Sequence, residues 1–158
     1  MSAHVAIPCS MLFVPATRPD RVEKAYATSA GAIIVDLEDA VAPRQRPEAR
    51  ECLARIVNNV DCSRLILRIN PPSTPDGIDD LQMLLRVARP PAFVMIPKSE
   101  SAEVMQMLDA LFAEANLDCG LLALVETARG LCAAEAIAGS CPRVAGLMLG
   151  AADMASNL

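Results

Sequence analysis

The sequence predicts an α/β fold of the (β/α)8 barrel type, to which this chain supplies about six of the eight β/α units. Short apolar runs alternate with segments of helical spacing along its 158 residues, which is typical of a parallel sheet with helices outside it. Nearly every run is apolar throughout, as expected of a strand that is buried on both faces. Polar residues stand at the ends of five runs, and a barrel brings all its strand ends to one mouth.

The first two strands lie in the N-terminal quarter of the sequence. An apolar run predicts a strand at residues 11–15, and a helix is expected at residues 21–30. Thr17 is the expected hydroxyl cap of that helix, because a proline and an acid follow it, and Gly31 is expected to end the helix. The apolar run at residues 32–35 is the second strand.

The middle of the sequence continues the alternation. Residues 48–57 have apolar side chains on one side of a predicted helix, and residues 65–70 form the third strand. A Ser-Thr-Pro-Asp-Gly turn is expected to stop that strand before a helix at residues 78–88. The fourth strand is predicted at residues 93–98, and helical spacing of apolar residues over 104–111 marks the next helix.

The last part of the sequence repeats the pattern with an acid after each strand. Residues 121–125 form a fifth apolar strand that ends on Glu126, and a short helix is predicted at residues 131–138. Residues 144–149 form the sixth strand. A Gly-Ala-Ala-Asp segment, which ends in Asp153, follows this strand.

The same alternation is also typical of an open doubly wound sheet, which concentrates its site at a switch point between two strands. Here no Gly-x-Gly-x-x-Gly follows the first strand and no phosphate-binding loop is present, so the barrel is favoured. Six strands cannot close an eight-stranded barrel, which usually needs more than about 200 residues. We therefore expect residues 1–158 to be a single barrel domain that is truncated at its C-terminus.

Glu126 and Asp153 follow sequential strands and are the predicted metal ligands. Neighbouring parallel strands lie about 4.8 Å apart, so the two carboxylates could bind one ion. Magnesium typically takes one or two protein carboxylates and fills its other positions with water and substrate oxygens, so Mg²⁺ is the expected cofactor. The alternative is that both acids are structural and pair with Arg129 or Arg143.

Five further polar residues stand at strand ends. Asp36 and Glu38 are expected to point to the same side and, with Asp39, to hold metal-bound waters or Arg68; the alternative is a solvated strand end or a helix cap. The planar fork of Arg68 suits bidentate binding of a carboxylate, or a salt bridge to Asp36 or Glu38. Lys98 could form a Schiff base with a substrate carbonyl, or an ion pair with a neighbouring acid.

Composition excludes several classes of function. The formal net charge is −5 with no basic run, and Trp is absent, which argues against nucleic acid and anionic membranes as partners. Six cysteines without a Cys-x-x-Cys pair indicate free thiols in a reducing cytoplasm. We expect no signal peptide and no membrane span. His4 is the sole histidine, which excludes histidine-bound zinc and Ser-His catalysis.

Six short segments in order resemble the citrate lyase β-subunit family, within the aldolase/citrate lyase superfamily. They are Leu-Phe-Val-Pro at 12–15, Val-Asp-Leu-Glu-Asp-Ala-Val at 35–41, Leu-Arg-Ile-Asn at 67–70, Ile-Pro-Lys at 96–98, Glu-Thr-Ala at 126–128 and Leu-Gly-Ala-Ala-Asp at 149–153. The resemblance extends over nearly all of the chain. It implies a TIM-barrel, Mg²⁺-dependent carbon–carbon lyase that acts on a 3-hydroxyacyl-CoA such as citryl-CoA or malyl-CoA and gives an acetyl-CoA-type product and a 2-oxo acid.

The resemblance also implies roles for particular residues. Glu126 and Asp153 would bind the metal, and Arg68 would hold a substrate carboxylate, with Glu126 also contacting substrate through the metal. In many members a C-terminal segment supplies an acid to a neighbouring subunit, which implies a homo-oligomer. Two alternatives stay open: a Schiff-base aldolase that uses Lys98, and a non-catalytic fragment or assembly subunit, because an incomplete barrel exposes two sheet edges.

Overall fold

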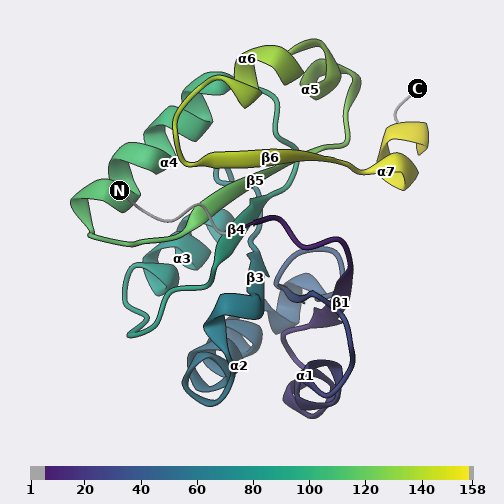
Figure 1. The fold of residues 1–158 in the computed structure, drawn as a ribbon, viewed down its shortest axis with the longest axis vertical. Helices are drawn as coiled ribbons and strands as arrows, with labels where there is room; N and C mark the ends of the chain where they lie inside the picture. The colour runs from purple at the N-terminus through teal and green to yellow at the C-terminus, as the bar shows by residue number, and fades with distance from the viewer. Residues whose placement is uncertain (1–5, 157–158) are drawn as a thin grey trace.

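The computed structural model describes residues 6–156 and contains one sheet of six parallel strands in the order β1-β2-β3-β4-β5-β6 (Figure 1). The strands are β1 (Met11–Pro15), β2 (Ala32–Asp36), β3 (Leu65–Arg68), β4 (Phe93–Ile96), β5 (Gly120–Val125) and β6 (Val144–Leu149). Sequential strands are neighbours throughout, whereas a doubly wound sheet reverses its order at a switch point. The parallel α/β class is confirmed, and the doubly wound alternative is wrong. Within the described residues, β1 and β6 are the sheet's two edges.

The helices cover one face of this curved sheet. They are α1 (Pro19–Tyr26), α2 (Arg46–Asn59), α3 (Pro75–Leu84), α4 (Ala102–Glu114), α5 (Ala128–Cys132), α6 (Ala134–Ala138) and α7 (Ala151–Ser156), with 3-10 turns η1 (Pro43–Gln45) and η2 (Cys62–Arg64). Figure 1 shows α1, α2 and α4 around the outside of the sheet and α7 at the end of β6. None of the described helices is long and apolar enough to cross a membrane.

Two apolar cores lie on the two faces of the sheet. The larger one joins strand residues such as Val35 and Leu67 to helix residues such as Leu53 and Phe112. The smaller one is built from strand side chains on the other face: Ala32, Ile34, Ile66, Phe93, Met95, Leu122 and Leu124. Strands bury side chains against one another on that face because the sheet curves, as it does in the wall of a barrel.

Helix α1 differs from its prediction at both ends. Its N-cap is Arg18 and not Thr17, and no side chain caps the helix; instead the Arg18 guanidinium binds Asp20 in the first turn at 2.8 Å. The helix ends at Tyr26, well before the predicted end at Gly31. Thr28 explains the early end, because its hydroxyl donates to the Ala25 carbonyl at 2.7 Å and competes with the helical hydrogen bonds.

The predicted turn after β3 is in fact the start of α3. Thr74 is the N-cap, since its hydroxyl accepts from the Gly77 amide at 3.1 Å, and Pro75 occupies the first helical position. The helix therefore begins three residues before the predicted start and ends at Leu84, four residues before the predicted end. Cap chemistry, which a search for apolar spacing overlooks, sets these boundaries.

The C-terminal helices also differ from the sequence prediction. The segment predicted as one helix at residues 131–138 is two short helices, α5 and α6. The Thr127 hydroxyl accepts from the Gly130 amide at 3.0 Å, so α5 begins at Ala128, before the predicted start. Helix α7, which carries Asp153, was not predicted. Asn70 and Lys98 lie just beyond the ends of β3 and β4, and His4 lies outside the described residues.

Candidate active site

Arg68 and Asp36 form a doubly hydrogen-bonded ion pair at the carboxyl ends of β2 and β3. They are direct partners in the register of β2 and β3, and Nε and Nη2 of Arg68 donate to the two Asp36 oxygens at 2.7 and 2.6 Å. The same carboxylate accepts from the backbone amides of Glu38 and Ala40, both at 2.9 Å. The Phe13 ring lies 5.0 Å from the guanidinium carbon. Both charges are buried, so this pairing fixes the direction of Arg68.

Lys98 continues the row of charges across the sheet. Its Nζ donates to Glu38 Oε1 at 2.6 Å and lies 3.7 Å from Glu126 Oε1. Its backbone is left-handed, with φ of 48°, a conformation that costs about 1–2 kcal/mol for a residue other than glycine. The Lys98 amide donates to Glu126 Oε1 at 2.9 Å, so the strained residue holds Glu126 through its backbone.

Glu126 is buried directly beside the start of α7. A Cβ added to Gly150 would lie 2.6 Å from Glu126 Cβ and 2.9 Å from Glu126 Oε2, so only glycine fits here. The Gly150 amide donates to the Val125 carbonyl at 2.9 Å and keeps the two strand ends together. Asp153, half-buried on α7, is close enough for its charge to act on Glu126. The two predicted metal ligands therefore follow neighbouring strands, and the charge of Asp153 acts on Glu126.

Asp39 is the outermost of the predicted acids. Its side chain is 54% exposed, and its carboxylate reaches Nη1 of Arg68 only at 3.4 Å. The seven predicted residues thus lie at or after the carboxyl ends of β2 to β6, where four of the carboxylates share two cationic groups and Asp153 acts on Glu126. These residues are Asp36, Glu38, Asp39, Arg68, Lys98, Glu126 and Asp153.

The electrostatics of this edge are dominated by burial and by excess negative charge. Burial raises the pKa of Glu126; the Lys98 amide and ammonium oppose this shift, and the charges of Glu38 and Asp153 reinforce it. Burial likewise raises the pKa of Glu38 against the opposing effect of Lys98. Burial lowers the pKa of Lys98, but its hydrogen bond to Glu38 and the nearby acids raise it overall, so the amine stays protonated.

Two buried carboxylate oxygens on this edge need a further partner. Glu126 Oε2 has no hydrogen-bond partner among the described residues, and neither has Glu38 Oε2, although Nη1 of Arg68 lies 3.3 Å from it. A buried polar atom without a partner is costly, and a cation at Glu126 Oε2 would remove that cost. No group of three or more metal-binding side chains occurs within residues 6–156. Two carboxylates with positions left for water and substrate suit Mg²⁺.

The arginine partners considered for Glu126 are engaged elsewhere. Arg129 is largely exposed and lies 4.0 Å from Glu100. Arg143 precedes β6 at the opposite end of the strand, where it donates to Asp109 at 2.9 Å. The alternative ion pair of Arg68 with Asp36 is present and occupies its bidentate fork, and the ion pair of Lys98 with Glu38 is present too.

Sequence reasoning missed three residues that shape this edge: Asn70, Asp80 and Gly150. Asp80 is completely buried and accepts from both the backbone and the side chain of Asn70 at 2.8 Å. A signal existed, because Asp80 lies four residues before the buried Leu84 and therefore on the same helical face. Nothing in the sequence signals that Gly150 touches Glu126.

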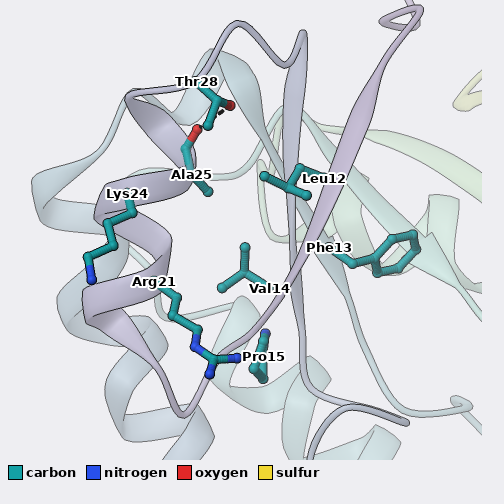
Figure 2. Close-up of a pocket in the computed structure, with 8 residues that line it drawn as sticks. All are labelled: Leu12, Phe13, Val14, Pro15, Arg21, Lys24, Ala25 and Thr28. Carbon is teal, nitrogen blue, oxygen red and sulfur yellow. Dashed lines mark hydrogen bonds between the residues drawn. The ribbon is translucent and has the colours of Figure 1, made fainter.

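A separate pocket of about 270 Å³ lies between β1 and α1 (Figure 2). Its lining residues are Leu12, Phe13, Val14, Pro15, Arg21, Lys24, Ala25 and Thr28. Figure 2 shows Phe13 on the opposite side of β1 from Arg21 and Lys24. Because the lining contains no carboxylate and most of it faces α1, this pocket is distinct from the acidic edge.

The sheet is parallel, and buried acids, an arginine and a lysine lie at the carboxyl ends of its strands. This arrangement defines the class of β/α proteins that carry their site at the strand ends. The comparison with known families agrees. Residues 9–158 match the family model described as HpcH/HpaI aldolase/citrate lyase, and the chain belongs to that family. The resemblance drawn from the six segments is thereby confirmed.

Curated relatives are similar over almost the whole of this chain. A citrate lyase subunit beta-like protein of Mycobacterium tuberculosis is 43% identical over 149 residues, which are 93% of this chain and 49% of the relative. A (3S)-malyl-CoA thioesterase of Cereibacter sphaeroides is 36% identical over 99% of this chain and 53% of the relative. The chain spans about half the length of the curated relatives it matches.

Solved structures share the fold. The citrate lyase beta subunit of M. tuberculosis, complexed with oxaloacetate and magnesium, superposes with a TM-score of 0.82 at 38% identity, over 97% of this chain and 62% of that one. CitE of M. tuberculosis in complex with magnesium, acetoacetate and coenzyme A gives 0.78 at 39% identity, over 98% and 52% of the two chains.

Proposed function

We propose that this chain carries the metal and carboxylate sites of a Mg²⁺-dependent carbon–carbon lyase. The substrate would be a 3-hydroxyacyl-CoA such as citryl-CoA or malyl-CoA, and the products an acetyl-CoA-type thioester and a 2-oxo acid. The observation that carries the proposal is the buried Glu126 Oε2, which has no hydrogen-bond partner within residues 6–156, in a carboxylate on which the charge of Asp153 acts. Relatives named as malyl-CoA lyases and a neighbour complexed with magnesium and oxaloacetate support it.

Glu126 and Asp153 are the residues that would hold the metal. When bound, Mg²⁺ supplies Lewis-acid polarisation of a carbonyl oxygen. The amide of Lys98 fixes one Glu126 oxygen at 2.9 Å and leaves the other oxygen for the cation. Gly150 keeps the space beside that carboxylate free of a side chain.

Arg68 is the residue that would bind the carboxylate of the 2-oxo acid. Asp36 occupies Nε and Nη2 at 2.7 and 2.6 Å, whereas the contacts of Nη1 with described residues are the longer ones of 3.3 and 3.4 Å to Glu38 and Asp39. Nη1 is therefore the nitrogen that can exchange a weak protein contact for a substrate oxygen. Cleavage leaves negative charge on the acetyl half, and the fixed charge of Lys98 would help to stabilise it.

The rival Schiff-base mechanism is disfavoured by the position of Lys98. A nucleophilic lysine needs a lowered pKa, and the Glu38 carboxylate at 2.6 Å acts in the opposite direction. Borohydride reduction with a 2-oxo acid, followed by mass spectrometry, decides between the mechanisms. A covalent adduct on Lys98 would support the rival.

The chain's place in the cell and its assembly are part of the same proposal. We take residues 1–158 as one barrel-type domain that acts in the cytoplasm, where the six free cysteines would stay reduced. We also propose a homo-oligomer, because Leu147 and Leu149 on the edge strand β6 are exposed. The alternative of a non-catalytic assembly subunit uses the same surface. Sedimentation separates these states from a monomer.

The experiment that tests the function is a lyase assay of the full chain with citryl-CoA and malyl-CoA. We expect cleavage that EDTA abolishes and Mg²⁺ restores. Unchanged activity in EDTA would contradict a metal-dependent lyase, and failure to cleave either thioester with Mg²⁺ bound would favour the assembly subunit.

A further inference from the structure

The completely buried carboxylate of Asp80 lies outside the row of charges that forms the candidate site. It is on α3, and its Oδ2 accepts from the Asn70 amide and from Asn70 Nδ2, both at 2.8 Å. Its Oδ1 accepts from Nη1 of Arg50 at 2.9 Å. All of these contacts are donors to a buried charge, so Asp80 is a fixed anchor for Asn70.

Asn70 passes this constraint to the end of β2. Its Nδ2 also donates to the Leu37 carbonyl at 3.0 Å. A flipped amide would place Oδ1 against the oxygens of Asp80 and Leu37, which are both acceptors, so these contacts determine the amide orientation. Asn70 is itself buried and joins α3 to the backbone between two strands.

Leu37 stands between the two acids that hold the site's cations. Its amide donates to the Arg68 carbonyl at 3.0 Å, while its carbonyl is held by Asn70. With the Leu37 peptide groups fixed from both sides, Asp36 meets the Arg68 guanidinium and Glu38 meets Lys98.

The position of α3 that makes these contacts possible depends on Gly77. A Cβ at Gly77 would lie 2.0 Å from the Pro71 carbonyl oxygen and 2.9 Å from that of Asn70. The first turn of α3 is thus pressed against the loop after β3, one turn before Asp80. This close approach gives the carboxylate its short distance to Asn70.

We propose that Asp80 is a positioning residue that acts through Asn70 and Leu37 to orient the Arg68 guanidinium. What Arg68 binds rests on the proposed function, but the orientation itself does not. Loss of either Asp80 or the Asn70 side chain frees the Leu37 carbonyl, so the Asp36–Arg68 pair opens more often.

The test is solvent exchange of the Arg68 Nε–H, measured by NMR on the full chain and assigned through Arg68→Lys. In Asp80→Ala and in Asn70→Ala we expect exchange about tenfold faster than in the parent. The double variant should be no faster than the faster single variant, because the two residues act in one chain of contacts. Gln82→Ala, at an exposed position of the same helix, is the matched control and should leave the rate unchanged.

Exchange of the Leu122 amide in β5 distinguishes a local effect at Arg68 from global destabilisation. The Leu122 exchange rate should not rise by the same factor as the Arg68 rate. Parent-like Arg68 exchange in Asn70→Ala overturns the proposal even if Asp80→Ala does not fold. Equal acceleration at Leu122 and Arg68 also overturns it.

Titration with oxaloacetate and Mg²⁺ gives a separate readout: weaker oxaloacetate binding with unchanged Mg²⁺ binding is expected in the two variants. A parent that binds neither contradicts the proposed function, while the exchange rates still decide the role of Asp80.

Discussion

Lys98 is the residue at which stability and metal binding are expected to respond in opposite directions. We predict that Lys98→Met tightens Mg²⁺ binding, because it removes a positive charge that lies 3.7 Å from Glu126. Without metal the variant should lose about 1 kcal/mol of stability, since Glu38 and Glu126 lose their counter-ion. Calorimetric Mg²⁺ titration and melts in EDTA measure both effects. Lys24→Met, at the chain's other lysine, is the control, and weaker Mg²⁺ binding in Lys98→Met would contradict the account.

Gly150 provides a second test at the scale of one residue. Gly150→Ala should cost about 1–3 kcal/mol and displace Glu126, because the new Cβ would meet the Glu126 side chain at 2.6–2.9 Å. Gly139→Ala is the matched control, with its nearest atom at 3.7 Å, and should change stability by less than about 1 kcal/mol. Denaturant unfolding compares the two variants. Equal effects would mean that Gly150 does not hold the space beside Glu126.

Some site residues could be predicted one by one and others could not. Arg68 and Glu126 stand out because each is a charge directly after an apolar run. Asp80 does not, because it looks like part of an acidic, solvated helix face together with Asp76 and Asp79. Its spacing from Leu84 places it on the buried helical face, but the contact with Asn70 comes from another element and leaves no local pattern.

At the scale of elements, strands were easier to predict than helices. A continuous apolar run marks a strand of a parallel sheet, so β1 and β6 have the predicted bounds even though these two edge strands are only partly buried. Helix ends depend on single hydrogen bonds such as those of Thr28 and Thr74, and these outweigh apolar periodicity. Helix α7 was missed because a six-residue helix has too few turns to show a period.

The contact between α2 and α3 predicts an acid-sensitive part of stability. The hydrogen bond from Arg46, at 2.6 Å, lowers the pKa of Asp76 below the unfolded value of 3.8. Between the pKa of the folded state and 3.8, the unfolded state binds more protons than the folded state. The stabilisation that the charged Asp76 provides is therefore complete above pH 3.8 and is lost as the pH falls through the folded pKa. Asp76→Asn should lower stability at pH 7 by up to about 1 kcal/mol and flatten its decline in acid. Urea unfolding from pH 2 to 7 measures the free energy of unfolding of both proteins. A decline of stability with falling pH that is as steep in Asp76→Asn as in the parent would contradict the prediction.

At the scale of the whole molecule, the consecutive strand order follows from crossovers in which a helical segment returns the chain to the next parallel strand. The order brings residues from five different strand ends to one edge, although they are spread over more than a hundred positions of the sequence. The sequence pattern predicted this convergence. It could not predict which oxygens lack partners, because that depends on the packing of every neighbouring side chain.

We propose that Glu126 and Asp153 bind one Mg²⁺ ion together. The decisive measurement is calorimetric titration of the full chain with Mg²⁺, beside Glu126→Gln, Asp153→Asn and the exposed control Asp39→Asn. We predict one site in the parent, binding at least about tenfold weaker in each ligand variant, equivalent to about 1.4 kcal/mol, and near-parent binding in the control. Melts in EDTA should show little loss of stability in the ligand variants, because like charges repel in the metal-free pair. Parent-like Mg²⁺ binding in both ligand variants, or collapse of both folds without metal, would contradict the claim.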